Sequence, residues 1–123
     1  MTKEKWDSII EEGGINIEHL SIRVFGEDEL LQEQIAQLTF DIWSDLMKKP
    51  PRSPDSLAAD VFYIVCKMTG NRVSVANMKK YTDMVYGKPL RVIPRSKTTK
   101  SKWPVEEREK AIILRHLPDE EAY

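Results

Sequence analysis

The fold of this chain is decided by the stretch Ser53-Pro54-Asp55-Ser56-Leu57-Ala58-Ala59-Asp60-Val61-Phe62-Tyr63-Ile64-Val65-Cys66-Lys67-Met68-Thr69-Gly70. Its two ends carry helix signals, because Ser53 is a suitable N-cap, Pro54 fits a first turn and Gly70 supplies a stop. The residues between them are apolar on almost every side, which predicts a helix in the centre of a bundle. The adjacent alanines would let a neighbouring helix approach closely.

On the N-terminal side, three more helices are expected. Residues 28–49 carry apolar side chains at helical spacing, with acids in the first turn and bases in the last. Residues 3–12 form a first expected helix, which Gly13-Gly14 should stop. Residues 16–25 form the next one, with Asn16 as its N-cap.

On the C-terminal side, Ser74 should cap a short helix over residues 75–81. The apolar pairs and runs at residues 85–86 and 90–93, which flank Gly87-Lys88-Pro89, are compatible with a short helix that starts at Pro89 or with a strand-like turn. Residues 95–102 lack apolar anchors and predict an exposed basic loop, and Pro104 begins a last helix that reaches about His116. The fold class is therefore all-α, a compact bundle of about five to six helices with a basic loop before the last one.

Length and composition set the class of protein. The 123 residues fit one domain that can bury a core without disulfides or metal. Cys66 is the only cysteine, which excludes a disulfide framework and a cysteine-rich zinc site. No apolar run approaches the roughly 20 residues of a membrane span, and the N-terminus does not resemble a signal peptide. We expect an intracellular protein, cytoplasmic or nucleoid-associated, without membrane contact.

Charge is divided unevenly along the chain, although 19 bases nearly balance 20 acids. Residues 1–47 hold 11 acids and 3 bases, whereas residues 67–102 hold 10 bases and 1 acid. Such a split is an argument about partners rather than about the fold. It makes the basic part of the chain the first candidate for a binding surface.

Nothing in the sequence predicts a catalytic site, a metal site or a cofactor. His19 and His116 lie far apart without metal-ligand spacing, and Cys66 suits a small core position. Asp60 on the central helix is expected to form a structural salt bridge or hydrogen bond. The acids Glu106, Glu107 and Glu109 share a helix with Arg108 and Lys110 and are expected to form a mixed charged face rather than to perform acid/base chemistry.

Several stretches together are similar to a known helical repeat. They are the short helix ending at Phe25-Gly26, the long helix 28–49, the link Pro50-Pro51-Arg52-Ser53-Pro54, the alanine-rich run Ser56–Cys66, and the turn Gly70-Asn71-Arg72-Val73-Ser74. Residues 16–95 thus resemble one cyclin-type repeat of the archaeal transcription factor B and eukaryotic transcription factor IIB family. Residues 1–15 would then be an N-terminal helix, and residues 96–123 a basic loop and C-terminal helix packed on the same domain.

The resemblance implies that the last two helices of the repeat form a helix-turn-helix that reaches the DNA major groove, and that other faces bind transcription proteins. Residues 74–81 would be the first helix of that pair, and Lys88–Ile93 would begin the recognition helix. This chain lacks the family's zinc ribbon and second repeat, so it is not a full initiation factor. Pro94 also falls where the recognition helix should continue. A proline in a helix interior destabilises the helix by about 3 kcal/mol.

Two non-enzymatic functions follow as hypotheses. The first is a DNA-associated transcription regulator, because clustered bases bind the closely spaced phosphates of a duplex. The alternative is a protein-interaction module that docks on polymerase, a general factor or another copy of itself without binding DNA. The residues expected to contact nucleic acid are Lys79, Lys80, Lys88, Arg91, Arg95, Lys97, Lys100 and Lys102.

Overall fold

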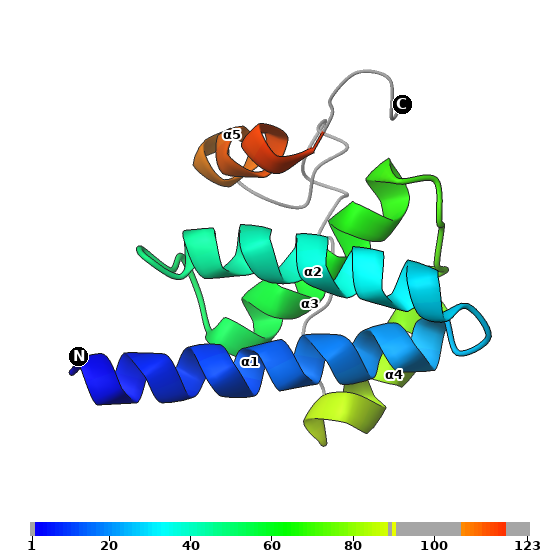
Figure 1. Ribbon diagram of the computed structural model, residues 1–123, viewed down its shortest axis with the longest axis horizontal. Coiled ribbons are helices and arrows are strands. Elements are labelled where there is room, and N and C mark those ends of the chain that lie inside the picture. Colours follow the sequence, from blue (N-terminus) through cyan, green and yellow to red (C-terminus); the bar gives the residue numbers. More distant parts are fainter. Residues whose placement is uncertain (1, 89, 91–106, 118–123) are drawn as a thin grey trace.

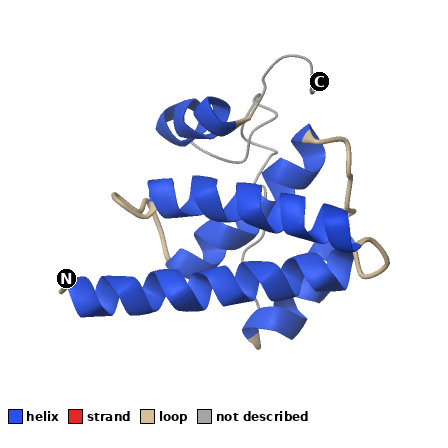
Figure 2. Cartoon of the chain, viewed as in Figure 1, coloured by secondary structure: helices blue, strands red, loops and turns tan. Residues whose placement is uncertain are grey.

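The computed structural model describes residues 2–88, 90 and 107–117, and every regular element in them is a helix (Figures 1 and 2). The helices are α1 (Lys3–Val24), α2 (Glu29–Leu46), α3 (Pro54–Met68), α4 (Val75–Tyr86) and α5 (Glu107–His116). α1 and α2 lie side by side and antiparallel, α3 and α4 pack behind them, and α5 contacts α2 (Figure 1). The predicted all-α bundle is confirmed, whereas its likeness to a cyclin repeat stays a prediction.

α3 is the central helix, as its sequence predicts. It contacts α1, α2 and α4, and Leu57, Val61, Phe62 and Val65 have no exposed surface. Burying each such side chain stabilises the fold by roughly 1.5–3 kcal/mol. The Ser53 hydroxyl accepts a hydrogen bond from the amide of Ser56, so the expected N-cap is also confirmed.

α1 runs without a break through Gly13-Gly14, so the two helices expected there are wrong. Gly13 is buried against the indole ring of Trp43, and Gly14 lies beside the ring of Phe40. The glycines therefore make room for α2 instead of ending α1. Asn16 is an interior residue of α1 rather than its N-cap, and the boundary expected between residues 15 and 16 falls inside this helix.

Side-chain hydrogen bonds cap α2 at its beginning and connect it to the beginning of α3. Asp28 caps α2 by accepting a hydrogen bond from the amide of Leu31 at 3.0 Å. Further along, the buried indole N–H of Trp43 donates to the carbonyl oxygen of Pro54 at 3.0 Å. This bond satisfies the polar atom of a completely buried ring and fixes where the chain enters α3.

α4 is longer than its sequence pattern predicts. It begins at the expected cap, Ser74, but continues to Tyr86 and ends where Gly87 takes a left-handed φ of 70°. Residues 82–86 are therefore helical. Lys88 and Leu90 are not helical, so the recognition helix expected to begin at Lys88 does not begin there. The rest of that expected helix, the basic loop 95–102 and the expected start of the last helix at Pro104 lie outside the described residues.

Candidate functional site

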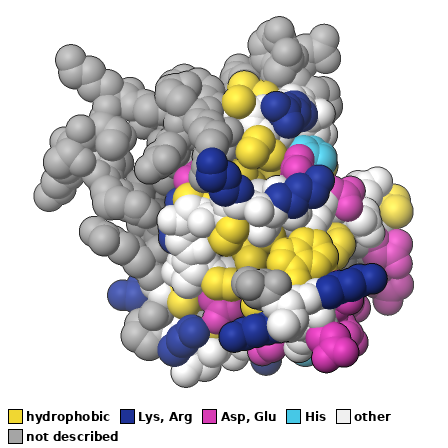
Figure 3. Space-filling view, turned by 90° about the vertical axis from the view of Figure 1, so that its left-hand side faces the viewer, with side chains coloured by type: hydrophobic (Ala, Val, Ile, Leu, Met, Phe, Trp, Pro, Cys, Tyr) yellow, Lys and Arg dark blue, Asp and Glu magenta, His cyan; other side chains and the backbone are white. Residues whose placement is uncertain are grey.

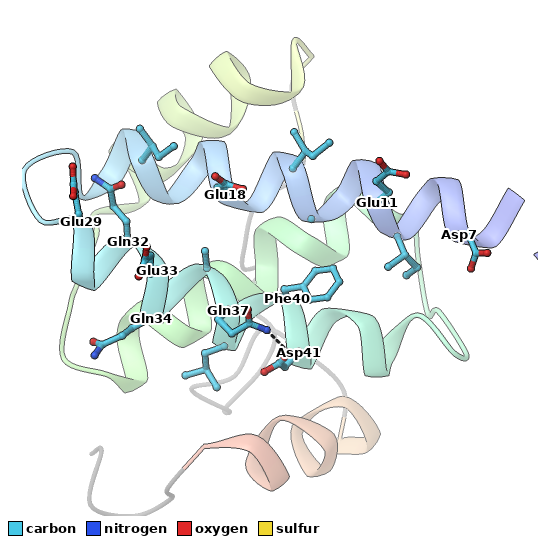
Figure 4. Close-up of a pocket in the computed structure, with 16 residues that line it drawn as sticks. Asp7, Glu11, Glu18, Glu29, Gln32, Glu33, Gln34, Gln37, Phe40 and Asp41 are labelled. Atoms are coloured by element: carbon cyan, nitrogen blue, oxygen red, sulfur yellow. Dashed lines mark hydrogen bonds between the residues drawn. The ribbon is translucent and has the colours of Figure 1, made fainter. Parts of the chain in front are cut away.

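An open groove of about 1210 Å³ lies along α1 and α2, on their side away from the core (Figure 4). Carboxylates from both helices surround it: Asp7, Glu11, Glu18, Glu29, Glu33 and Asp41. No Lys, Arg or His is among the described residues that line it. The groove therefore carries a strong negative potential, which favours a positively charged ligand.

Apolar side chains form the floor of this acidic groove. Phe40 lies between the two helices, and Ile10, Ile15, Ile22 and Leu38 also line the groove (Figure 4). Ile15 is 48% exposed and Ile22 is 43% exposed, so both present a large apolar surface to water. A partner that covered them would gain roughly 25 cal/mol for each Å² of apolar surface removed from water.

The groove follows from residue spacing on the two helices. On α1, Glu11, Ile15, Glu18 and Ile22 recur at intervals of three or four residues, which puts them on one side of the helix. α2 repeats this pattern with acids and amides, and Gln37 donates a hydrogen bond to Asp41 at 2.8 Å (Figure 4). Because Gly14 lines the groove without a side chain, the ring of Phe40 can lie close to α1.

The basic residues singled out from the sequence are only partly described. Lys79 and Lys80 are exposed on α4, and the Lys80 ammonium lies 5.9 Å from the ring centre of Tyr81. The Lys88 ammonium pairs with Asp55 at 3.0 Å, at the beginning of α3. Arg91, Arg95, Lys97, Lys100 and Lys102 lie outside the described residues. On the face in Figure 3, the visible Lys and Arg side chains are spread over several places instead of forming one patch.

A buried ion network joins α5 to the rest of the bundle. The Arg52 guanidinium donates to Asp60 Oδ2 at 3.0 Å and to both carboxylate oxygens of Glu109 at 2.9 and 3.1 Å. Asp60 and Glu109 have no exposed surface. Burial opposes the charge on Arg52, but the bonds to Glu109 and the negative charges of both partners raise its pKa above its ordinary value. The expected structural role of Asp60 is confirmed.

Glu109 is completely buried, which the expected mixed charged face does not predict. Its partner Arg52 lies 57 positions away in the sequence, which no local charge pattern can reveal. A carboxylate without exposed surface needs such a partner, because an unpaired charge in this environment would be strongly unfavourable. The network has a structural role, since Arg52 connects Asp60 of α3 to Glu109 of α5.

The other potentially reactive side chains, Cys66 and His116, are also held in structural contacts. Cys66 is completely buried, and burial raises the pKa of its thiol to about 12, which makes it a poor nucleophile. His116 forms a 3.1 Å hydrogen bond with Asp45, which holds the pKa of that carboxyl below its usual value. Within the described part of the chain, no three His, Cys, Asp or Glu residues are arranged to hold a metal ion.

Comparisons with known proteins add no relative. No known protein family, no curated protein and no solved structure matches the chain. None of the described helices combines the length and the apolar character that crossing a bilayer requires. We therefore infer a function from the groove and from the charges of the described helices.

Proposed function

We propose that this protein is a non-catalytic protein-interaction module, and that it docks its partner in the acidic groove between α1 and α2. The observation that supports this proposal is an apolar floor inside a rim of six carboxylates with no base among the described lining residues. The partner that fits is a basic amphipathic segment. Its apolar side would cover Ile15 and Ile22, and its Lys or Arg side chains would pair with the acids.

Charge and apolar contact have separate parts in this binding. Exposed ion pairs contribute only about 0.2–1 kcal/mol each, so the acids mainly select a basic partner and speed its approach. The apolar floor supplies most of the affinity, because the hydrophobic effect depends on the surface removed from water. Binding should therefore weaken with added salt without disappearing completely.

A labelled, synthetic amphipathic helix with lysines on one side and leucines on the other tests the proposal by fluorescence anisotropy. The double variant Glu18→Lys/Glu33→Lys should weaken binding by roughly tenfold or more, which corresponds to about 1.4 kcal/mol. The matched control is Glu12→Lys/Glu27→Lys, which makes the same charge change at exposed acids outside the groove. Equal losses in the two double variants would show that only overall charge matters.

The apolar floor has its own control. Ile15→Ser removes an exposed side chain inside the groove, and Leu30→Ser removes one outside it that is 66% exposed. Neither residue belongs to the buried core, so both variants should fold. We expect Ile15→Ser to weaken peptide binding and Leu30→Ser to leave it unchanged, and the reverse order would exclude the groove.

Association with duplex DNA is a second candidate function. It is supported by Lys79 and Lys80, which are exposed on the helix that the cyclin-repeat resemblance assigns to a DNA-binding pair. Neither lysine forms an ion pair among the described residues. Binding through six or so phosphates should weaken steeply between about 50 and 200 mM salt, and Lys79→Glu/Lys80→Glu should reduce it. An absence of DNA binding even at low salt would exclude this function.

A further inference from the structure

We propose that the occupant of the acidic groove is a second copy of this chain, which contributes its basic segment, residues 91–103. This inference rests on the proposed function of the groove and names its partner. Two different surfaces meet in such a contact, the groove of one copy and the basic segment of the next. The association is therefore head-to-tail, and it can continue from copy to copy or close into a ring.

Charge complementarity is the first argument. The groove presents six carboxylates and no base among the described residues that line it. The basic segment has the opposite composition, five bases and no acid: Arg91, Arg95, Lys97, Lys100 and Lys102. The formal net charge of the whole chain is only −1, so two copies have little overall charge repulsion to overcome. Opposite local charges on nearly neutral molecules favour this orientation over the others.

Apolar residues in the segment match the floor of the groove. Val92-Ile93 precede the main group of bases and Trp103 follows it. The groove offers exposed Ile15 and Ile22 to such side chains. The segment is also long enough, because the part of α1 that lines the groove rises about 22 Å at 1.5 Å per residue. Seven extended residues already cover that distance at about 3.3 Å each.

The positions of the segment's neighbours favour a second copy over the same copy. Leu90, just before the segment, packs in the buried core, and Glu109, shortly after it, is held by Arg52. The groove opens on the side of α1 and α2 away from their buried positions, which include Gly13, Ile17 and Leu20. The groove of another copy is not subject to the constraint that these two attachments place on the segment's own copy.

The test is the molar mass of the full chain by light scattering at two protein concentrations and two salt concentrations. We expect a mass above the 14.3 kDa of the monomer that rises with protein concentration and falls with added salt. Glu18→Lys/Glu33→Lys reverses charge in the groove, and Lys97→Glu/Lys100→Glu reverses it in the segment. Each double variant alone should be a monomer, whereas an equal mixture of the two should associate again.

The restoration in the mixture is the decisive result, because it requires the two surfaces to contact each other. The control Glu12→Lys/Glu27→Lys should associate like the wild type, and circular dichroism should show that every variant is folded. A wild-type mass of 14.3 kDa at all concentrations, or a mixture that stays monomeric, would overturn the proposal. If the wild type is monomeric and the synthetic peptide still binds, only this inference fails and the proposed function stands.

Discussion

At Gly13, the absence of a side chain lets the indole ring of Trp43 lie against the backbone of α1. A glycine inside a helix is less favourable than alanine by roughly 0.5–1 kcal/mol. In this position the disadvantage is offset, because a Cβ would overlap the buried ring. Gly14 differs, since a Cβ there would meet the Phe40 ring only at 3.1 Å.

Alanine substitutions at the two glycines should therefore have different effects. Gly13→Ala should lower the free energy of unfolding by roughly 1–3 kcal/mol, the usual effect of overpacking a core. Gly14→Ala should have a small effect, because the better helix propensity compensates for a contact that the half-buried ring can relieve. Chemical denaturation of both variants measures the difference. Equal stabilities would mean that Trp43 does not press on Gly13.

Cys66 provides a prediction about pH. In the folded chain, burial raises the pKa of the Cys66 thiol from the usual 9.0 to about 12. Between these two pH values the thiol stays protonated in the folded chain, whereas it ionises in the unfolded chain. Stability should consequently fall as the pH rises above about 9, by about 1.4 kcal/mol per unit. Urea denaturation at pH 7 and about pH 10 should show a larger loss for the wild type than for Cys66→Ala. Equal losses would contradict this account.

At the scale of the elements, α5 is held to the bundle by the ion network of Arg52, by the buried side chain of Ile113 and by the bond between His116 and Asp45. Glu109→Ala should lower the free energy of unfolding by about 2–3 kcal/mol, because it removes two charged hydrogen bonds and leaves the partly buried Arg52 with Asp60 as its remaining carboxylate partner. Arg115→Ala is the matched control, because Arg115 is exposed on the same helix. This substitution should change the free energy of unfolding by less than about 0.5 kcal/mol. Thermal unfolding followed by circular dichroism checks both, and similar melting temperatures would show that the network is dispensable.

The elements also show which features of the fold depend only on neighbouring residues in the sequence. Ser53 and Ser74 are confirmed as caps, because capping depends on residues within one turn. The break expected at Gly13-Gly14 is wrong, because the fate of those glycines depends on Trp43, which lies on another helix. Glu109 is misjudged for the same reason, since its burial depends on Arg52. Predictions from sequence fail here where a distant side chain overrides the local preference.

At the scale of the whole molecule, the structure shows where the unevenly distributed charges lie. Counting acids and bases is enough to predict an acidic N-terminal half, and the structure gathers six of those acids around one groove. The basic residues between positions 79 and 102 attracted the first functional hypothesis, yet only three of the eight expected contact residues, Lys79, Lys80 and Lys88, are described. The groove could have been suspected from the sequence, because Glu11, Ile15, Glu18 and Ile22 repeat at helical spacing. The sequence could not show that α2 lies beside α1 and lines the same groove.

The most direct test of the account is a nuclear magnetic resonance titration of the ¹⁵N-labelled Lys97→Glu/Lys100→Glu variant with the synthetic basic amphipathic helix. This variant keeps all the described groove residues and should leave the groove empty. The account predicts chemical-shift changes concentrated at Gly14, Ile15, Ile22 and Gln37, with Lys79 and Lys80 unaffected. Changes concentrated on α4, or an absence of changes along α1 and α2, would contradict the claim that the acidic groove is the binding site.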